Sequence, residues 1–140
     1  MTLLLDTCIV SDAARNADAA LERWLRSQSP LDLHLSVLSL GEIRKGIELL
    51  ATAKKREKLR AWLEHDLQAQ FAGRLLGVTS DVAREWGRLT ATAQKSGRPL
   101  PVIDGLLLAT AQAHGLTFVT RNTKDVDRRG VAVLNPYSTP

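Results

Sequence analysis

The sequence predicts an α/β fold in which a parallel sheet of four or five short strands carries helices on both faces. Short apolar runs of strand length alternate along the chain with longer segments of helical periodicity. These runs are apolar throughout, which is typical of parallel strands buried on both faces. No linker, low-complexity tract or internal repeat divides the chain, so we expect residues 1–140 to form a single domain.

The first elements follow from short-range patterns. An apolar run predicts a strand over 3–5, and apolar residues at helical spacing predict a helix over about 11–26. A second short strand is expected at 33–35. Either Ser36 or Ser39 can cap the next helix, which has one apolar face that we expect to pack inward.

A helix predicted over 59–71 leaves two questions open. Its apolar face either packs on the core or remains in part available to a second copy of the chain. The basic residues at its start are either a solvated helix end or a contact for RNA phosphates. These residues are Lys54, Lys55, Arg56, Lys58 and Arg60.

The remaining elements alternate in the same way. A helix is predicted over about 80–96, and another over 101–113 that begins with a proline and is closed by Gly115. Residues rich in β-formers predict strands over 116–120 and 131–134.

Composition and charge narrow the function classes. The net charge of +4 favours a polyanionic partner, but six aromatic residues are too few for a base-stacking surface. The single cysteine, Cys8, excludes a disulfide within the chain and suits the cytoplasm. No apolar run approaches the roughly 18 residues of a membrane helix, and no basic stretch opens a signal peptide, so we expect neither membrane insertion nor secretion.

Three acids occupy positions where a site is expected. Asp6 directly follows the first strand, where parallel sheets bind ligands, and it is equally suited to cap the next helix. Glu42 borders an apolar stripe of its helix, which predicts a partly buried acid that needs a partner. Asp104 precedes apolar residues on the face expected to meet the sheet; the alternative is that it caps a helix beginning one residue later.

Further polar residues follow the strand predicted over 116–120. Asn122, Asp125 and Asp127 lie in a turn that also leaves a strand end. If these acids converge with the three above, their repulsion would raise pKa values unless a cation neutralises them. Oxygen ligands without clustered Cys or His suit Mg²⁺ or Mn²⁺ and disfavour zinc. The alternative for Asp125 is a cap, or a turn acid paired with one of the two arginines at 128 and 129.

Other chemistries have little support. The chain lacks the glycine-rich phosphate loops and the nucleophile elbow, and Cys8 has no sequence sign of a base partner. A non-catalytic binding domain would share the fold and charge without requiring the three acids together. A phosphoryl-transfer enzyme or phospho-acceptor domain could use Asp6, but the residues that follow it supply no second acid.

Four short motifs follow one another along the chain: Leu4-Leu5-Asp6-Thr7, Ser39-Leu40-Gly41-Glu42-Ile43, Ile103-Asp104-Gly105-Leu106 and Val119-Thr120-Arg121-Asn122. In this order they resemble the motifs of PIN-domain ribonucleases. Within that superfamily the chain is similar to the toxins of bacterial VapBC-type toxin–antitoxin pairs. Its closing Val133-Leu134-Asn135-Pro136-Tyr137 resembles the FitB-like branch.

This resemblance implies a PIN-like parallel sheet and a metal-dependent endoribonuclease that acts as the toxin of a type II pair. It implies RNA as substrate, Mg²⁺ as cofactor with Mn²⁺ as a substitute, a cognate antitoxin and a homodimer. The alternative is a non-catalytic PIN-like regulator that binds nucleic acid or a partner. Asp6, Glu42 and Asp104 match the family's metal-binding acids, Asn122 matches a fourth position, and we expect Asp125 to provide the remaining negative charge.

The resemblance extends to supporting residues, with two departures. Thr7 and Thr120 match hydroxyl positions that hold the site together, whereas Cys8 replaces an Asn and Val126 replaces an aromatic residue. Three ionised acids around one Mg²⁺ leave a negative charge, so RNA would need basic residues nearby. The candidates are Arg44, Lys45, Arg121, Lys124 and Arg128.

Overall fold

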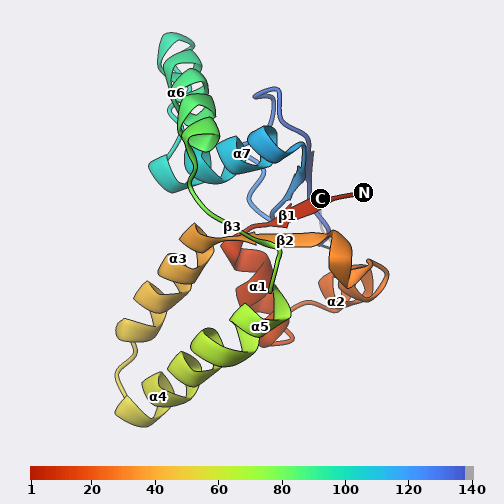
Figure 1. The fold of residues 1–140 in the computed structure, drawn as a ribbon, viewed down its shortest axis with the longest axis vertical. Coiled ribbons are helices and arrows are strands. Elements are labelled where there is room, and N and C mark those ends of the chain that lie inside the picture. The colour runs from red at the N-terminus through yellow and green to blue at the C-terminus, as the bar shows by residue number, and fades with distance from the viewer. Residues whose placement is uncertain (138–140) are drawn as a thin grey trace.

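Five short strands form one parallel sheet in the computed structural model, which describes residues 1–137 (Figure 1). The strand order is β3-β2-β1-β4-β5, and every neighbouring pair is parallel. The strands are β1 (Leu3–Leu5), β2 (Leu33–Ser36), β3 (Leu75–Leu76), β4 (Thr117–Val119) and β5 (Val133–Leu134). The predicted fold class is confirmed, with five strands.

Helices cover both faces of the sheet, with α6 and α7 on one side and α1 to α5 on the other (Figure 1). Their bounds are α1 Thr7–Ala14, α2 Ala19–Arg26, α3 Val37–Glu48, α4 Ala53–Ala61, α5 Gln68–Gln70, α6 Ser80–Lys95 and α7 Val102–His114. A 3₁₀ turn spans Pro30–Asp32, and a π-helical segment spans Trp62–Leu67. No helix in the described part of the chain has both the length and the apolarity to cross a membrane.

The central strand explains why the core has two halves. Successive side chains of a strand point to opposite faces, so Leu3 and Leu5 pack with α1, α2 and α3, whereas Leu4 packs with α6 and α7. All three leucines are buried, and each contributes about 1.5–3 kcal/mol relative to an exposed side chain. The uninterrupted apolar run in the sequence is therefore the signature of a strand between two helical layers.

The helix predicted over 11–26 is wrong as a single element, because two helices occupy this region. Helix α1 begins four residues earlier than expected, since Asp6 accepts a hydrogen bond from the Thr7 N–H and caps it. Asn16 then adopts a left-handed conformation with φ of 52°, which ends α1. Asp18 caps α2 by accepting from the Leu21 N–H at 2.9 Å.

Strand β3 is the element that the sequence pattern missed. It has only two residues and gains its position by pairing with β2, where Leu35 aligns with Leu75 and Ser36 with Leu76. A two-residue strand is too short to produce a periodic signal, so only the neighbouring strand defines it.

The helical segment around 59–71 packs on the core. It starts earlier than predicted, at Ala53, and its residues Leu63, Leu67 and Phe71 are buried. Leu59 and Trp62 of the same face are only partly buried, and Trp62 lines two surface cavities. Both interpretations of this face therefore hold in part. In the basic cluster, Arg60 donates to Glu48 Oε1 at 2.7 Å, so its charge is already paired.

The end of the described chain is fixed by a C-terminal clasp that consists of Asp12, Arg15, Arg121 and Tyr137. The Tyr137 hydroxyl donates to Asp12 Oδ2 at 2.6 Å, and Arg15 donates to Asp12 Oδ1 at 2.7 Å. The Arg121 guanidinium lies 4.3 Å from the centroid of the Tyr137 ring. Burial opposes ionisation of Asp12, but the bonds from Tyr137 and Arg15 and the charge of Arg121 together hold its pKa below the ordinary value.

We predict that Tyr137→Phe lowers the free energy of unfolding by about 1–3 kcal/mol at neutral pH, because Asp12 loses a buried hydrogen bond. The folded-state pKa of Asp12 is lowered, so its contribution is full above the unfolded-state pKa and is lost as the pH falls through the folded-state pKa. Urea unfolding of both proteins should show the difference shrinking in acid. Arg15→Ala, which removes an exposed partner, should cost less; an equal or larger cost would contradict this account.

Candidate active site

Asp6 connects the sheet, the first helix and the site. Its backbone N–H donates to the Val119 carbonyl at 2.9 Å, which extends the pairing of β1 with β4. Its side chain accepts from the Thr7 N–H at 2.7 Å and from the Thr120 hydroxyl at 2.7 Å. The two interpretations of Asp6, helix cap and strand-end acid, therefore hold together.

Glu42 is joined to Asp6 through Thr7. The Thr7 hydroxyl donates to Glu42 Oε1 at 2.6 Å and lies 2.8 Å from the Ser39 hydroxyl. The expectation of a partly buried Glu42 is wrong, because the residue is exposed. Helix α3 presents Ser39, Ile43 and Ile47 to the core, so the row that contains Glu42 lies at the edge of the packed face.

Asp104 faces the same region from the other helical layer. Helix α7 begins at Val102 after Pro101, so Asp104 lies within its first turn and the cap interpretation is wrong. Burial raises the pKa of Asp104, and the negative charges of Asp6, Asp125 and Glu42 raise it further. Four carboxylates from separate parts of the chain therefore share one electrostatic environment, which we call the acid cluster.

Asp125 and Asn122, the two candidate residues in the turn after β4, differ in their relation to the acid cluster. The charge of Asp125 acts on both Asp104 and Arg129, but its carboxylate forms no close ion pair with Arg128 or Arg129 in the described chain. The paired-turn-acid interpretation therefore holds only as a longer-range interaction with Arg129. Asn122 is exposed, and its backbone N–H donates to the Thr120 hydroxyl at 3.1 Å. No hydrogen bond joins the Asn122 side chain to the acid cluster within residues 1–137.

Hydroxyls and one thiol, rather than cations, contact the acid cluster. None of its four members takes part in an ion pair among the described residues. Cys8 donates to Asp6 Oδ2 at 3.7 Å, and burial, followed by the charge of Asp6, raises the pKa of the thiol. Cys8 is therefore a neutral donor and not an activated nucleophile.

Two arginines hold the turn around Asp125: Arg129, which the sequence had suggested as its partner, and Arg98, which no sequence pattern had indicated. Arg129 Nε donates to the Asp125 carbonyl at 2.6 Å, and Arg129 Nη1 donates to the Arg98 carbonyl at 3.2 Å. Arg98 Nη2 donates to the Lys124 carbonyl at 3.4 Å and to Asp127 Oδ1 at 3.3 Å. These bonds tie the turn to the segment that precedes α7, and α7 in turn carries Asp104.

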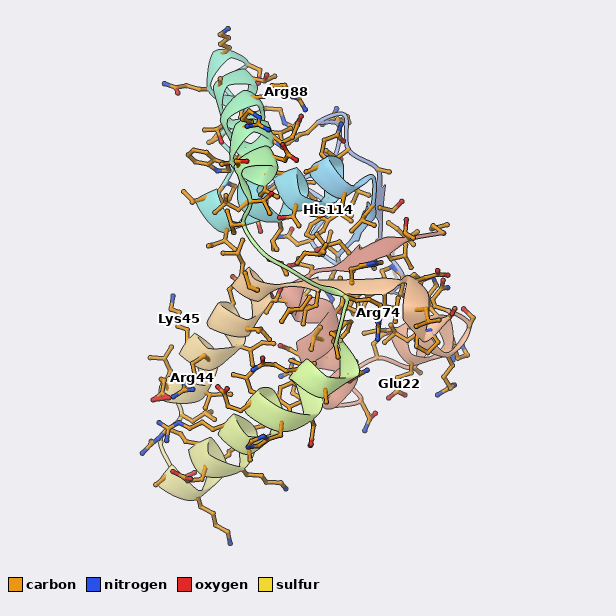
Figure 2. The ribbon with its side chains drawn as sticks, viewed as in Figure 1. Glu22, Arg44, Lys45, Arg74, Arg88 and His114 are labelled. Carbon is orange, nitrogen blue, oxygen red and sulfur yellow. The ribbon has the colours of Figure 1, made fainter. Side chains whose placement is uncertain are left out.

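The basic residues expected near the site have mixed positions. Arg44 and Lys45 project from α3, and Arg44 is ion-paired with Glu48 and Glu64 (Figure 2). Arg121 belongs to the C-terminal clasp. Arg44 and Arg121 share a helix or loop with a site residue, but their charges already interact with other side chains of the protein.

The chemistry of the acid cluster suits a hard divalent cation. It offers only carboxylate oxygens, and the repulsion that raises the pKa of Asp104 is of the kind that a cation relieves. As they stand, no three His, Cys, Asp or Glu side chains within residues 1–137 converge into a group that could hold an ion. The residues present fit a metal in kind, and binding would require their side chains to move together.

Comparison with known families decides the classification. A sequence profile described as the PIN domain matches residues 3–130. The chain belongs to the PIN-domain family.

Individual relatives of this PIN domain cover nearly its whole length. It is 35% identical over 136 residues to the toxin FitB of Neisseria gonorrhoeae, covering 96% of this chain and 98% of that protein. It is 32% identical to the VapC ribonuclease Y4jK of Sinorhizobium fredii, and the match covers 96% of this chain and 97% of that protein. The crystal structure of FitAcB from Neisseria gonorrhoeae superimposes with a TM-score of 0.91 at 34% identity. The superposition covers 96% of this chain and 98% of that one.

A structure of FitAB bound to an IR36 DNA fragment superimposes with a TM-score of 0.90 at 33% identity, covering 96% of this chain and 95% of that one. Both superpositions extend over the strands and helices that place the acid cluster. The PIN-like sheet predicted from the motifs is thus confirmed.

We predict that Thr120→Val lowers the free energy of unfolding by about 1–3 kcal/mol, because Asp6 loses a buried donor and the Asn122 N–H loses its acceptor. Thr120→Ser keeps the hydroxyl and should cost less than Thr120→Val. Chemical denaturation of the three proteins checks this ranking. If serine proves as destabilising as valine, methyl packing and not the hydroxyl accounts for the effect.

Proposed function

We propose that this PIN domain is a metal-dependent endoribonuclease that acts as the toxin of a type II toxin–antitoxin pair. The observation that carries the proposal is the acid cluster, in which Asp104 feels the charges of Asp6, Glu42 and Asp125. None of these four carboxylates forms an ion pair in the described chain, and Asp6 follows the end of a parallel strand, an arrangement that suits metal-assisted hydrolysis. Membership of a family whose relatives include a VapC ribonuclease supports the same activity.

Asp6, Glu42 and Asp104 are the proposed ligands of Mg²⁺, for which Mn²⁺ can substitute. Once bound, the metal would lower the pKa of a water molecule and stabilise charge on the scissile phosphate. Thr120 and the Thr7 backbone orient the two oxygens of Asp6, and the Thr7 hydroxyl orients Glu42. Asn122 is proposed as a neutral oxygen donor, and Asp125 as the further negative charge that acts through water or a second metal.

We predict that Asp6→Asn, Glu42→Gln and Asp104→Asn each abolish metal-dependent RNA cleavage while the fold is retained, because each substitution is nearly isosteric. Cleavage of a labelled RNA with and without excess EDTA measures the activity, and circular dichroism checks the fold. Full activity in any variant, or in EDTA, would contradict the assignment. Binding of Mg²⁺ by calorimetry without cleavage of any RNA would instead support the non-catalytic regulator.

We predict that Asp125→Asn reduces turnover and raises the Mg²⁺ concentration required, because the metal site loses a nearby negative charge. Asn122→Asp should have the opposite effect on Mg²⁺ affinity, since it adds a carboxylate at a strand end. Titration of Mg²⁺ in the cleavage assay compares both with the parent. Unchanged affinity in Asn122→Asp would show that its side chain points away from the acid cluster.

We also propose that residues 1–140 act as one PIN domain that forms a homodimer and is inhibited by a cognate antitoxin protein. The proposal rests on the family, whose solved relatives include the FitAB complex. Expression of this chain alone should arrest bacterial growth, and co-expression of the adjacent small reading frame should relieve the arrest. Light scattering of the purified protein should give twice the monomer mass; a monomer at every accessible concentration would refute the dimer.

A further inference from the structure

A cavity lined by arginines lies beside the turn that carries Asp125, and the proposed reaction does not use it. It has a volume of about 290 Å³ and opens between α6 and the turn over 128–130. Its charged lining residues are Arg88, Arg98, Arg128 and Arg129, and no acidic side chain among residues 1–137 lines it. We call it the arginine cavity.

The nearby acids neutralise only part of this charge. Arg88 pairs with Glu85 at 2.8 Å, and Arg98 pairs with Asp127 at 3.3 Å. Arg128 lies 3.9 Å from the same Asp127. Arg129 donates only to backbone carbonyls. The charges of Asp125 and Asp127 also act on Arg129, so the four guanidinium groups share three carboxylates, which leaves a positive charge at the cavity.

Arg88 and Arg128 have N–H groups that remain available to a ligand. Arg98 and Arg129 use theirs mainly to build the turn, as described for the site. Arg88 donates from Nε and Nη2 only, so three of the five N–H groups of its guanidinium have no partner in the described chain. The Arg128 side chain is 82% exposed. Arg88 projects from α6 on the side of the molecule that holds α6 and α7 (Figure 2).

Arg128 has a backbone conformation that arginine rarely adopts. Its φ is 53°, in the left-handed region that favours glycine. Such strain persists where the surrounding structure imposes it, and glycine at this position would remove both the strain and the charge. Arg128→Gly should therefore stabilise the fold while it weakens the binding of an anion.

We propose that the arginine cavity binds a backbone phosphate of the RNA substrate, separate from the phosphate at the acid cluster. The inference rests on the proposed function and extends it. The cavity and the acid cluster share one turn, because Arg129 Nε donates to the carbonyl of Asp125. An RNA strand that reaches Asp125 can therefore continue along the same turn to Arg128. Guanidinium groups bind phosphate through paired N–H groups, and the lining contains no aromatic residue that would stack on a base.

The test measures RNA binding in the Asp104→Asn background without added metal, so that cleavage does not interfere. Fluorescence anisotropy would compare RNAs of about four and about sixteen nucleotides over a range of salt concentrations. Arg88→Ala and Arg128→Gly should each weaken binding of the long RNA about two- to fivefold and lower its salt slope by about 0.7. The short RNA should be unaffected. Arg128→Gly should melt at an equal or higher temperature than its parent.

The matched control is Arg84→Ala, one turn earlier on α6, where the arginine pairs with Asp81 and does not line the cavity. It should leave the salt slope unchanged. Equal salt slopes for the parent and both cavity variants would overturn the inference, as would an equal loss on short and long RNA. If wild-type protein cuts RNA while the slopes are unchanged, only this inference fails; if the slopes change but no RNA is cut, only the proposed function fails.

Discussion

The structure depends on the position of Asp6 at the end of the central strand. Its N–H continues the hydrogen bonding between β1 and β4, one carboxylate oxygen caps α1, and the other accepts from Thr120. A residue without a side-chain oxygen would leave the first turn of α1 and the buried Thr120 hydroxyl without their acceptor. The same group is the proposed first metal ligand, so stability and chemistry constrain one side chain together.

The donors around the acid cluster explain how negative charge is concentrated without being cancelled. Thr7 and Thr120 fix the positions of carboxylates through neutral hydroxyls, whereas Glu48 and Asp12, away from the cluster, are held by arginines. A neutral donor orients a carboxylate but leaves most of its charge in place, as the raised pKa of Asp104 indicates. The fold thus accepts electrostatic repulsion at one edge of the sheet.

The sequence predicted the parts that have a local signature. Leu3–Leu5 reads as a buried strand because its neighbours on both faces are helices, and Asp6 and Asp104 stand out because an acid adjoins apolar residues. Glu42 was singled out as a candidate from its place on the helix, but its exposure was not predicted, since helical periodicity does not specify which edge of the helix meets the sheet. The bonds from Arg129 to Arg98, 31 residues apart, and from Tyr137 to Asp12, 125 residues apart, leave no periodic trace and required the structure.

The strand order also bears on when the protein can fold during synthesis. The first strand made, β1, lies at the centre of the sheet and needs β4 as a neighbour, and Thr120 and Asp6 are separated by 114 positions. Closing such a distant contact carries a large entropic cost early in folding, and it cannot occur before the late strand has left the ribosome. The acids are therefore assembled only after β4 and Thr120 have emerged. A nascent chain that has exposed β1 but not β4 therefore carries Asp6 without the neighbours that orient its carboxylate.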